Sequence, residues 1–157
     1  MTSLRDLNPD FRDLLLCFGR EGVEYVLVGA YALAFHGAPR ATGDIDVFVR
    51  PTPANAERTW RALIAFGAPL ATAGVEPRDF ATPGIVYQIG LPPRRVDILT
   101  ELSGVSFDEA WESRAMADLE GLPVAFLGRE ALIANKRASG RLKDLADVER
   151  LEGSEDR

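Results

Sequence analysis

The chain has 157 residues, enough for one domain with a packed core and too few for two domains of ordinary size. Its net charge of -6 argues against a broad cationic surface that wraps duplex DNA, and its apolar fraction of 46% argues against extensive disorder. No apolar run approaches the roughly 18 residues of a membrane span, and the first residues lack the apolar stretch of a signal peptide. We therefore expect a single cytoplasmic domain over 1–157 without membrane association.

The first half of the chain predicts helices alternating with two short strands. The first helix has apolar residues at helical spacing and Gly19 as its expected C-cap, and the third has Gly67 at its exit. The strands are β-branched and aromatic runs, which are typical of buried strands. The predicted elements are a helix over 7–19, a strand over 23–29, a helix over 30–35, a strand over 44–49 and a helix over 51–66.

The second half predicts two more strands and a helical C-terminal part. A glycine- and proline-containing connection over 68–84 precedes strands over 85–89 and 95–99, which could pair as a hairpin. The remaining elements are a short helix over 107–112, a weak strand over 122–126 and a helical segment over 129–151 that is interrupted or bent near Gly140. This order predicts an α/β (α+β) fold with a mixed central sheet, a core of about 7–100, and a C-terminal helical part of about 105–151.

Asp44 and Asp46 are the strongest candidates for a chemical site. Residues two apart on a strand point to the same face, so the two carboxylates lie side by side while Ile45 and Val47 point into the core. Like charges this close repel, and a divalent cation such as Mg²⁺ or Mn²⁺ would relieve the repulsion with oxygen ligands that it favours. The pair therefore predicts a cation site.

Asp97 is a candidate third carboxylate. It lies in a later strand between the apolar Val96 and Ile98, so its side chain points away from their face. If that strand lies beside the strand of Asp44, the three carboxylates form one cluster. The alternative is that these aspartates are solvated acids on the exposed face of an amphipathic strand.

Gly29 ends the first strand where the next helix begins. Backbone N–H groups at a helix start lack intrahelical partners and can receive a phosphate, and a glycine lets the backbone approach a ligand closely. The other interpretation of Gly29 is an ordinary structural turn.

The C-terminal helical segment carries charged residues along one side. Their steps of three and four place Lys136, Lys143 and Asp144 on one face, with Lys136 able to reach a triphosphate. The alternative is a solvated helix with ion pairs such as Arg141 with Asp144. An apolar side that faces the core is expected from Leu142, Leu145, Val148 and Leu151.

These motifs together resemble the nucleotidyltransferase superfamily of the DNA polymerase β type. The stretches 26–37 and 40–49 carry the resemblance most strongly, through Gly29 and the Asp44 and Asp46 pair. Asp97 fits the third acidic position, and the segment over 131–151 resembles the lysine and Arg/Lys-Asp helical signature of the toxin-like branch. The likeness is greatest to small bacterial members, including minimal nucleotidyltransferases and abortive-infection toxins of toxin–antitoxin systems.

The resemblance implies a nucleotidyltransferase fold and a metal-dependent transfer of NMP from an NTP to a hydroxyl of RNA, protein or a small molecule. It implies Asp44, Asp46 and Asp97 as catalytic and metal-ligating residues, with Mg²⁺ or Mn²⁺ as cofactor. Nucleotide contacts are implied for Gly29, Ala30, Arg40, Thr42, Lys136, Lys143 and Asp144.

One residue departs from the family pattern. Ala30 stands where glycine or a hydroxyl residue is usual, so it supplies a backbone N–H but no hydroxyl for a phosphate oxygen. The partners to be expected are an NTP, tRNA or another RNA, or a cognate toxin or antitoxin. The alternative function is a catalytically weak antitoxin or protein-binding module that retains the fold.

Overall fold

The computed structural model describes residues 7–39, 43–91 and 94–155. Its first half contains α1 (Pro9–Glu21), β1 (Tyr25–Val28), α2 (Gly29–Phe35), β2 (Ile45–Val49), α3 (Pro53–Phe66) and the 3₁₀ helix η1 (Pro77–Ala81). Its second half contains β3 (Val86–Ile89), β4 (Val96–Leu99), α4 (Phe107–Glu112), β5 (Ala115–Leu119), β6 (Leu122–Phe126), α5 (Arg129–Ser139) and α6 (Leu142–Glu155).

The six strands form one mixed sheet in the order β3-β4-β2-β1-β6-β5. The β1–β2, β3–β4 and β5–β6 pairs are antiparallel, whereas β2–β4 and β1–β6 are parallel. The predicted mixed α/β architecture is therefore confirmed, and the two strands expected to form a hairpin do pair as β3 and β4.

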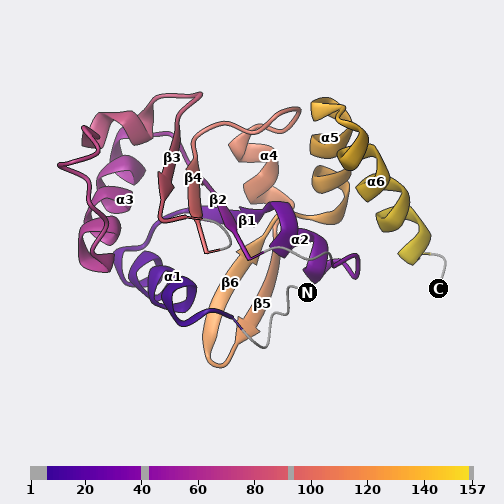
Figure 1. The fold of residues 1–157 in the computed structure, drawn as a ribbon, viewed down its shortest axis with the longest axis horizontal. Coiled ribbons are helices and arrows are strands. Elements are labelled where there is room, and N and C mark those ends of the chain that lie inside the picture. The colour runs from indigo at the N-terminus through magenta and orange to yellow at the C-terminus, as the bar shows by residue number, and fades with distance from the viewer. Residues whose placement is uncertain (1–6, 40–42, 92–93, 156–157) are drawn as a thin grey trace.

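Helices cover both faces of the sheet, and each face has its own apolar cluster. Tyr25 and Leu27 of β1 pack toward α1 and α3, while Val26 and Val28 pack toward α2, α4, α5 and α6. Figure 1 shows α1 and α3 gathered on one side of the sheet and α5 and α6 on the other. Alternation along β1 therefore assigns each side chain to one of the two layers.

The structure differs from the sequence predictions at the end of the first helix, in the connection over 68–84, at β5 and on one face of α6. The first helix runs two residues beyond Gly19 and ends at Gly22, whose left-handed φ of 69° makes it the cap. The predicted connection over 68–84 contains η1, and the edge strand β5 was not expected. On α6, Leu142 is 87% exposed and Leu145 42%, so the predicted apolar face is wrong there.

The described helices include none that is both long and apolar enough to cross a bilayer.

Asn55 fixes the end of the sheet from which β1 starts. Its Oδ1 accepts from the N–H of Glu24 at 2.8 Å, and its Nδ2 donates to the carbonyls of Glu24 and Arg50, both at 3.0 Å. Glu24 immediately precedes β1 and Arg50 immediately follows β2. One buried amide on α3 thus ties together the ends of the two strands whose pairing positions Asp46.

We expect Asn55→Ala to lower the free energy of unfolding by about 2–3 kcal/mol, because three backbone groups would lose their partner in a partly buried place. Urea unfolding followed by circular dichroism measures the loss. Asn135→Ala is the matched control, since its exposed side chain donates a single bond to the Ser103 carbonyl at 3.0 Å. Equal losses of unfolding free energy in the two variants would show that the Asn55 side chain does not stabilise the strand ends.

Candidate active site

The three aspartates predicted to cluster do lie close together on one face of the sheet. Parallel pairing of β2 with β4 sets Asp46 opposite Asp97, and Asp44 comes just before β2. Ile45, Val47 and the apolar neighbours of Asp97 are buried in the layer of α1 and α3. The carboxylates therefore project from the opposite face, toward the layer that contains α2 and α5.

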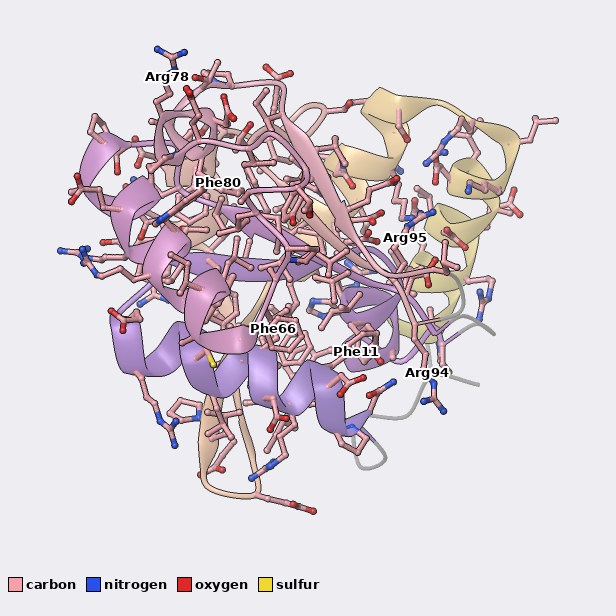
Figure 2. All side chains as sticks on the ribbon, turned by 60° about the vertical axis from the view of Figure 1, so that its left-hand side comes forward. Phe11, Phe66, Arg78, Phe80, Arg94 and Arg95 are labelled. Carbon is pink, nitrogen blue, oxygen red and sulfur yellow. The ribbon has the colours of Figure 1, made fainter. Side chains whose placement is uncertain are left out.

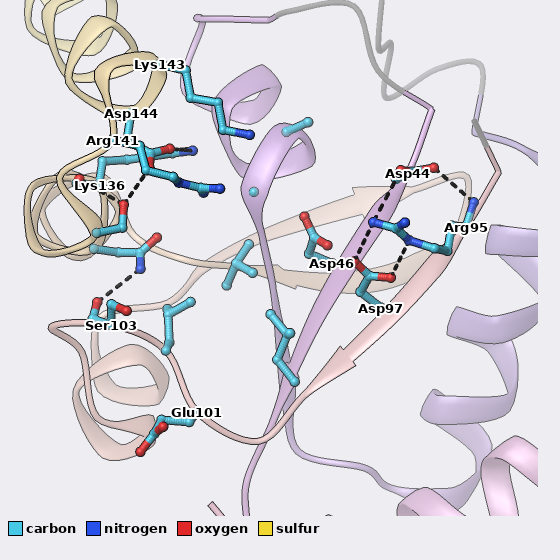
Figure 3. A pocket seen from close by; sticks show the side chains of 17 residues that line it. Asp44, Asp46, Arg95, Asp97, Glu101, Ser103, Lys136, Arg141, Lys143 and Asp144 are labelled. Atoms are coloured by element: carbon cyan, nitrogen blue, oxygen red, sulfur yellow. Dashed lines mark hydrogen bonds and ion pairs between the residues drawn. The ribbon is translucent and has the colours of Figure 1, made fainter. Parts of the chain in front are cut away.

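Arg95 lies among these carboxylates and bridges two of them. Its Nε is 2.8 Å from Oδ1 of Asp97 and its Nη2 is 3.2 Å from Oδ2 of the same residue. Its Nη2 is also 3.8 Å from Oδ2 of Asp44, whose Oδ1 accepts from the Arg95 backbone N–H at 3.0 Å. Figure 3 shows the guanidinium between Asp44 and Asp97.

Asp46 lies in surroundings that disfavour its anionic form. Burial, followed by the charge of Asp97, a hydrogen bond to it and the charge of Asp44, raises the pKa of Asp46 to about 7, although Arg95 opposes the shift. Among the described residues, no group of three acidic, histidine or cysteine side chains is already arranged to hold a metal ion. The donors are nevertheless carboxylate oxygens of the kind that Mg²⁺ favours, and a cation would relieve the strain on Asp46.

Gly29 is required by the aspartate that it faces. It has a φ of 63°, and a Cβ built on it would overlap Oδ2 of Asp46, far inside the 3.0 Å limit of real Cβ contacts. It opens the seven-residue α2, which also holds the buried Ala30. The turn between β1 and α2 thus packs directly against the carboxylate cluster.

The facing wall is built on a buried charge network at the junction of α5 and α6. Nζ of Lys136 lies 3.3 Å from Asp144 and 3.2 Å from Asp147, and all three side chains are at most 7% exposed. Burial alone would raise the pKa of Asp144, but hydrogen bonds from Ser139 and Arg141 and the charge of Lys136 hold it at about 2.

Lys143 differs from Lys136 in being exposed. It makes no ion pair with another described side chain, and Figure 3 shows its ammonium group directed over the cleft. The predicted pairing of Arg141 with Asp144 is present at 2.7 Å. The structure thus brings the lysines to one wall but makes one a buried partner of aspartates and leaves the other accessible.

A cleft of about 430 Å³ separates the two walls. Predicted residues that line it are Gly29, Ala30, Asp44, Asp46, Asp97, Lys136, Lys143 and Asp144. Arg40 and Thr42 lie outside the described residues. The polar or charged lining residues outside that predicted set are Arg95, Glu101, Ser103, Asn135, Ser139 and Arg141.

No protein-family model matches the sequence, and no curated protein matches it. Solved structures do match the fold. The lincosamide antibiotic adenylyltransferase LnuA, bound to lincomycin, is 11% identical, with a TM-score of 0.55 over 92% of this chain and 96% of that one. The antibiotic-resistance factor ANT(2″)-Ia is 15% identical, with a TM-score of 0.56 over 92% of this chain and 82% of that one.

The chain has the nucleotidyltransferase fold. A protein from Thermotoga maritima that is provisionally named a nucleotidyltransferase matches as well, with 16% identity and a TM-score of 0.54 over 91% of this chain and 88% of that one. Identities this low establish the fold alone. The predicted nucleotidyltransferase fold is therefore confirmed, and the activity depends on what the cleft residues can do.

Within this fold, we expect Gly29→Ala to destabilise the protein by about 1–3 kcal/mol, because the new methyl group must displace the Asp46 carboxylate. Gly22→Ala is the matched control, since Gly22 has a similar φ of 69° but nothing within 4 Å of the added Cβ. Urea unfolding of both variants separates the overlap from the backbone strain that they share. A loss no greater at Gly29 than at Gly22 would contradict this account of the turn.

The raised pKa of Asp46 predicts that stability depends on pH. The value is 3.8 in the unfolded chain and about 7 in the folded protein, so the folded state binds more protons between these values. The contribution is full below pH 3.8 and is lost as the pH rises through about 7. The free energy of unfolding should therefore fall across this range when divalent metal is chelated.

We expect Asp46→Asn to flatten this decline. At pH 8 its free energy of unfolding should exceed that of the wild type by about 1.4 kcal/mol or more, the equivalent of one pKa unit. Urea unfolding at several pH values in EDTA provides the measurement. Asp13→Asn, which changes an exposed aspartate of α1, should keep the wild-type profile. An undiminished slope in Asp46→Asn would assign the pH dependence to other groups.

Proposed function

We propose that this protein is a metal-dependent nucleotidyltransferase that moves NMP from an NTP to an acceptor hydroxyl. The observation that carries the proposal is the Asp46 and Asp97 pair, set in register on adjacent strands and destabilised as two anions. In the reaction, a bond forms between the acceptor oxygen and the α-phosphorus, and the bond from that phosphorus to the bridging oxygen breaks. Pyrophosphate leaves, and the acceptor's proton passes to a carboxylate.

The carboxylates are the residues that would hold the metal. Asp44 and Asp46 supply oxygen ligands, and Asp97 serves either as a third ligand or as the base that accepts the proton. Mg²⁺, when bound, neutralises phosphate charge and lowers the pKa of the acceptor hydroxyl. The proximity of the three carboxylates on one face of the sheet supports these roles.

The facing wall would hold the triphosphate. Lys143 is the accessible cation there, and its ammonium group over the cleft suits a phosphate oxygen. Lys136 and Asp144 support this wall from within, because their buried pairing fixes α5 against α6. The backbone at Gly29 and Ala30 would face the phosphates from the other side, and contacts from Arg40 and Thr42 stay predictions.

The net charge of the chain disfavours a nucleic-acid acceptor. At -6 the chain offers no broad cationic surface for a long nucleic acid. LnuA is bound to lincomycin, and ANT(2″)-Ia has been seen with adenylyl-2″-tobramycin. A hydroxyl-bearing small molecule is therefore the first acceptor class to test, before RNA or a protein such as a cognate toxin or antitoxin.

We expect Mg²⁺ with the preferred NTP to raise the melting temperature by about 5 °C or more at saturating concentration. The double variant Asp44→Asn with Asp46→Asn should lose this shift, because the ligands for the metal are gone. With α-labelled NTPs and a panel of small hydroxyl compounds, total RNA and proteins, transfer should fall roughly 1,000-fold in the variant.

The two readouts separate the candidate functions. Binding of nucleotide with transfer to some member of the panel supports the enzyme and identifies its acceptor class. Tight binding without transfer to any member would favour the alternative, a nucleotide-binding partner module. Absence of any metal-dependent shift in the wild type would contradict a nucleotidyltransferase site.

A further inference from the structure

Arg95 occupies the place that a cation would take between two of the carboxylates. Its guanidinium contacts both oxygens of Asp97 and approaches Asp44, so it provides part of the positive charge that the cluster needs. We propose that Arg95 is a built-in counter-cation that leaves the carboxylates when metal and nucleotide bind and then binds a phosphate of the nucleotide. This proposal rests on the metal site of the proposed function.

The guanidinium and a metal ion compete for the same atoms. Both oxygens of Asp97 already accept hydrogen bonds from Arg95, at 2.8 and 3.2 Å, in the two-pronged arrangement that arginine makes with carboxylates. A divalent cation bound to Asp97 would lie within a few Å of the guanidinium and repel it. The two cations therefore exclude each other, and the apparent metal affinity is reduced by the cost of displacing Arg95.

The backbone at Arg95 can remain in place while its side chain moves. Its N–H donates to Oδ1 of Asp44 at 3.0 Å and its carbonyl accepts from the Ile45 N–H at 3.0 Å, so both bonds survive substitution of the side chain. The side chain itself is 29% exposed, at the boundary of the cleft. A rotation of the guanidinium therefore needs no change in the sheet.

The cleft gives the displaced guanidinium an anion to bind. Arg95 lines the same cleft as Lys143, on the opposite wall. A triphosphate held between the walls would bring oxygens to the side chain as the metal takes Asp97, and a guanidinium matches a phosphate with two parallel hydrogen bonds. Arg95 would thus exchange one anionic partner for another, which links metal binding to nucleotide binding.

The neighbouring Arg94 provides a matched control. It has the same charge but is exposed and does not line the cleft, and Figure 2 shows its side chain at the outer edge of the molecule. Arg94→Gln therefore changes the net charge by the same amount as Arg95→Gln without touching the carboxylates. Any difference between the two variants reports the position of Arg95 rather than long-range charge.

The test is calorimetric titration of Mn²⁺ without nucleotide, followed by titration of a non-hydrolysable NTP analogue with Mn²⁺ present. We expect Arg95→Gln to bind Mn²⁺ alone about 5- to 10-fold more tightly than the wild type and to bind the analogue about 10-fold more weakly. Its metal-free form should also melt at a lower temperature, because the carboxylates lose a counter-cation. Arg94→Gln should match the wild type in all three measurements.

Arg95→Lys keeps the experiment decisive if Arg95→Gln does not fold, because lysine retains the charge but not the two-pronged contact. Its Mn²⁺ affinity should be raised and its analogue affinity lowered, by smaller factors. Equal or weaker Mn²⁺ binding in the Arg95 variants than in a wild type that does bind Mn²⁺ would overturn the proposal and leave the proposed function standing. If neither the wild type nor the variants bind Mn²⁺, the metal site and this proposal both fail.

Discussion

The register of the parallel β2–β4 pair is the constraint on which the site depends. It sets Asp46 and Asp97 directly opposite each other, where the charge of Asp97 disfavours the anionic form of Asp46. Sheet pairing normally avoids like charges at opposed positions because they destabilise the ladder. Here the apolar residues on either side of each aspartate are buried in the layer of α1 and α3, so a shift of one residue would turn the aspartates into that apolar layer instead. Burial of the apolar neighbours therefore fixes a pairing of Asp46 with Asp97 that the repulsion between their charges disfavours.

The two walls of the cleft balance their charges in different ways. On the wall of α5 and α6, Lys136 is enclosed with Asp144 and Asp147, and substitution of Lys136 would take the shared cation from two buried carboxylates. On the sheet wall, Arg95 meets the carboxylates from a partly exposed position and can leave them without exposing core. The first network is a fixed support, whereas the second is exchangeable. This difference places the adaptable chemistry on the sheet wall.

Sequence periodicity was sufficient to locate the carboxylates but not to locate the charges that oppose them. Strand alternation placed Asp44, Asp46 and Asp97 on one face, and the same rule places Arg95, two residues before Asp97, on that face as well. The pairing of Lys136 was not predictable, because it depends on the angle at which α6 returns against α5. The prediction that Leu142 faces the core is wrong for the same reason. Asp144 and Asp147 lie on the buried face of α6 instead. Edge strand β5 was missed because its sequence, Ala-Met-Ala-Asp-Leu, does not alternate between apolar and polar residues, and only its pairing with β6 defines it.

Gly29 shows why the charge arrangement carries more weight for function than the glycine turn. A glycine at the start of a helix after a strand suggests a phosphate site, yet here the lack of a side chain is already required by the Asp46 carboxylate. The glycine therefore follows from the aspartate and is not independent support for a nucleotide. Ala30 fits the same view, because it is buried in the packing of α2 and a larger polar side chain there would need room and a partner. Holding Asp46 beside Asp97 has an electrostatic cost that the fold alone does not offset, and a bound cation would remove it.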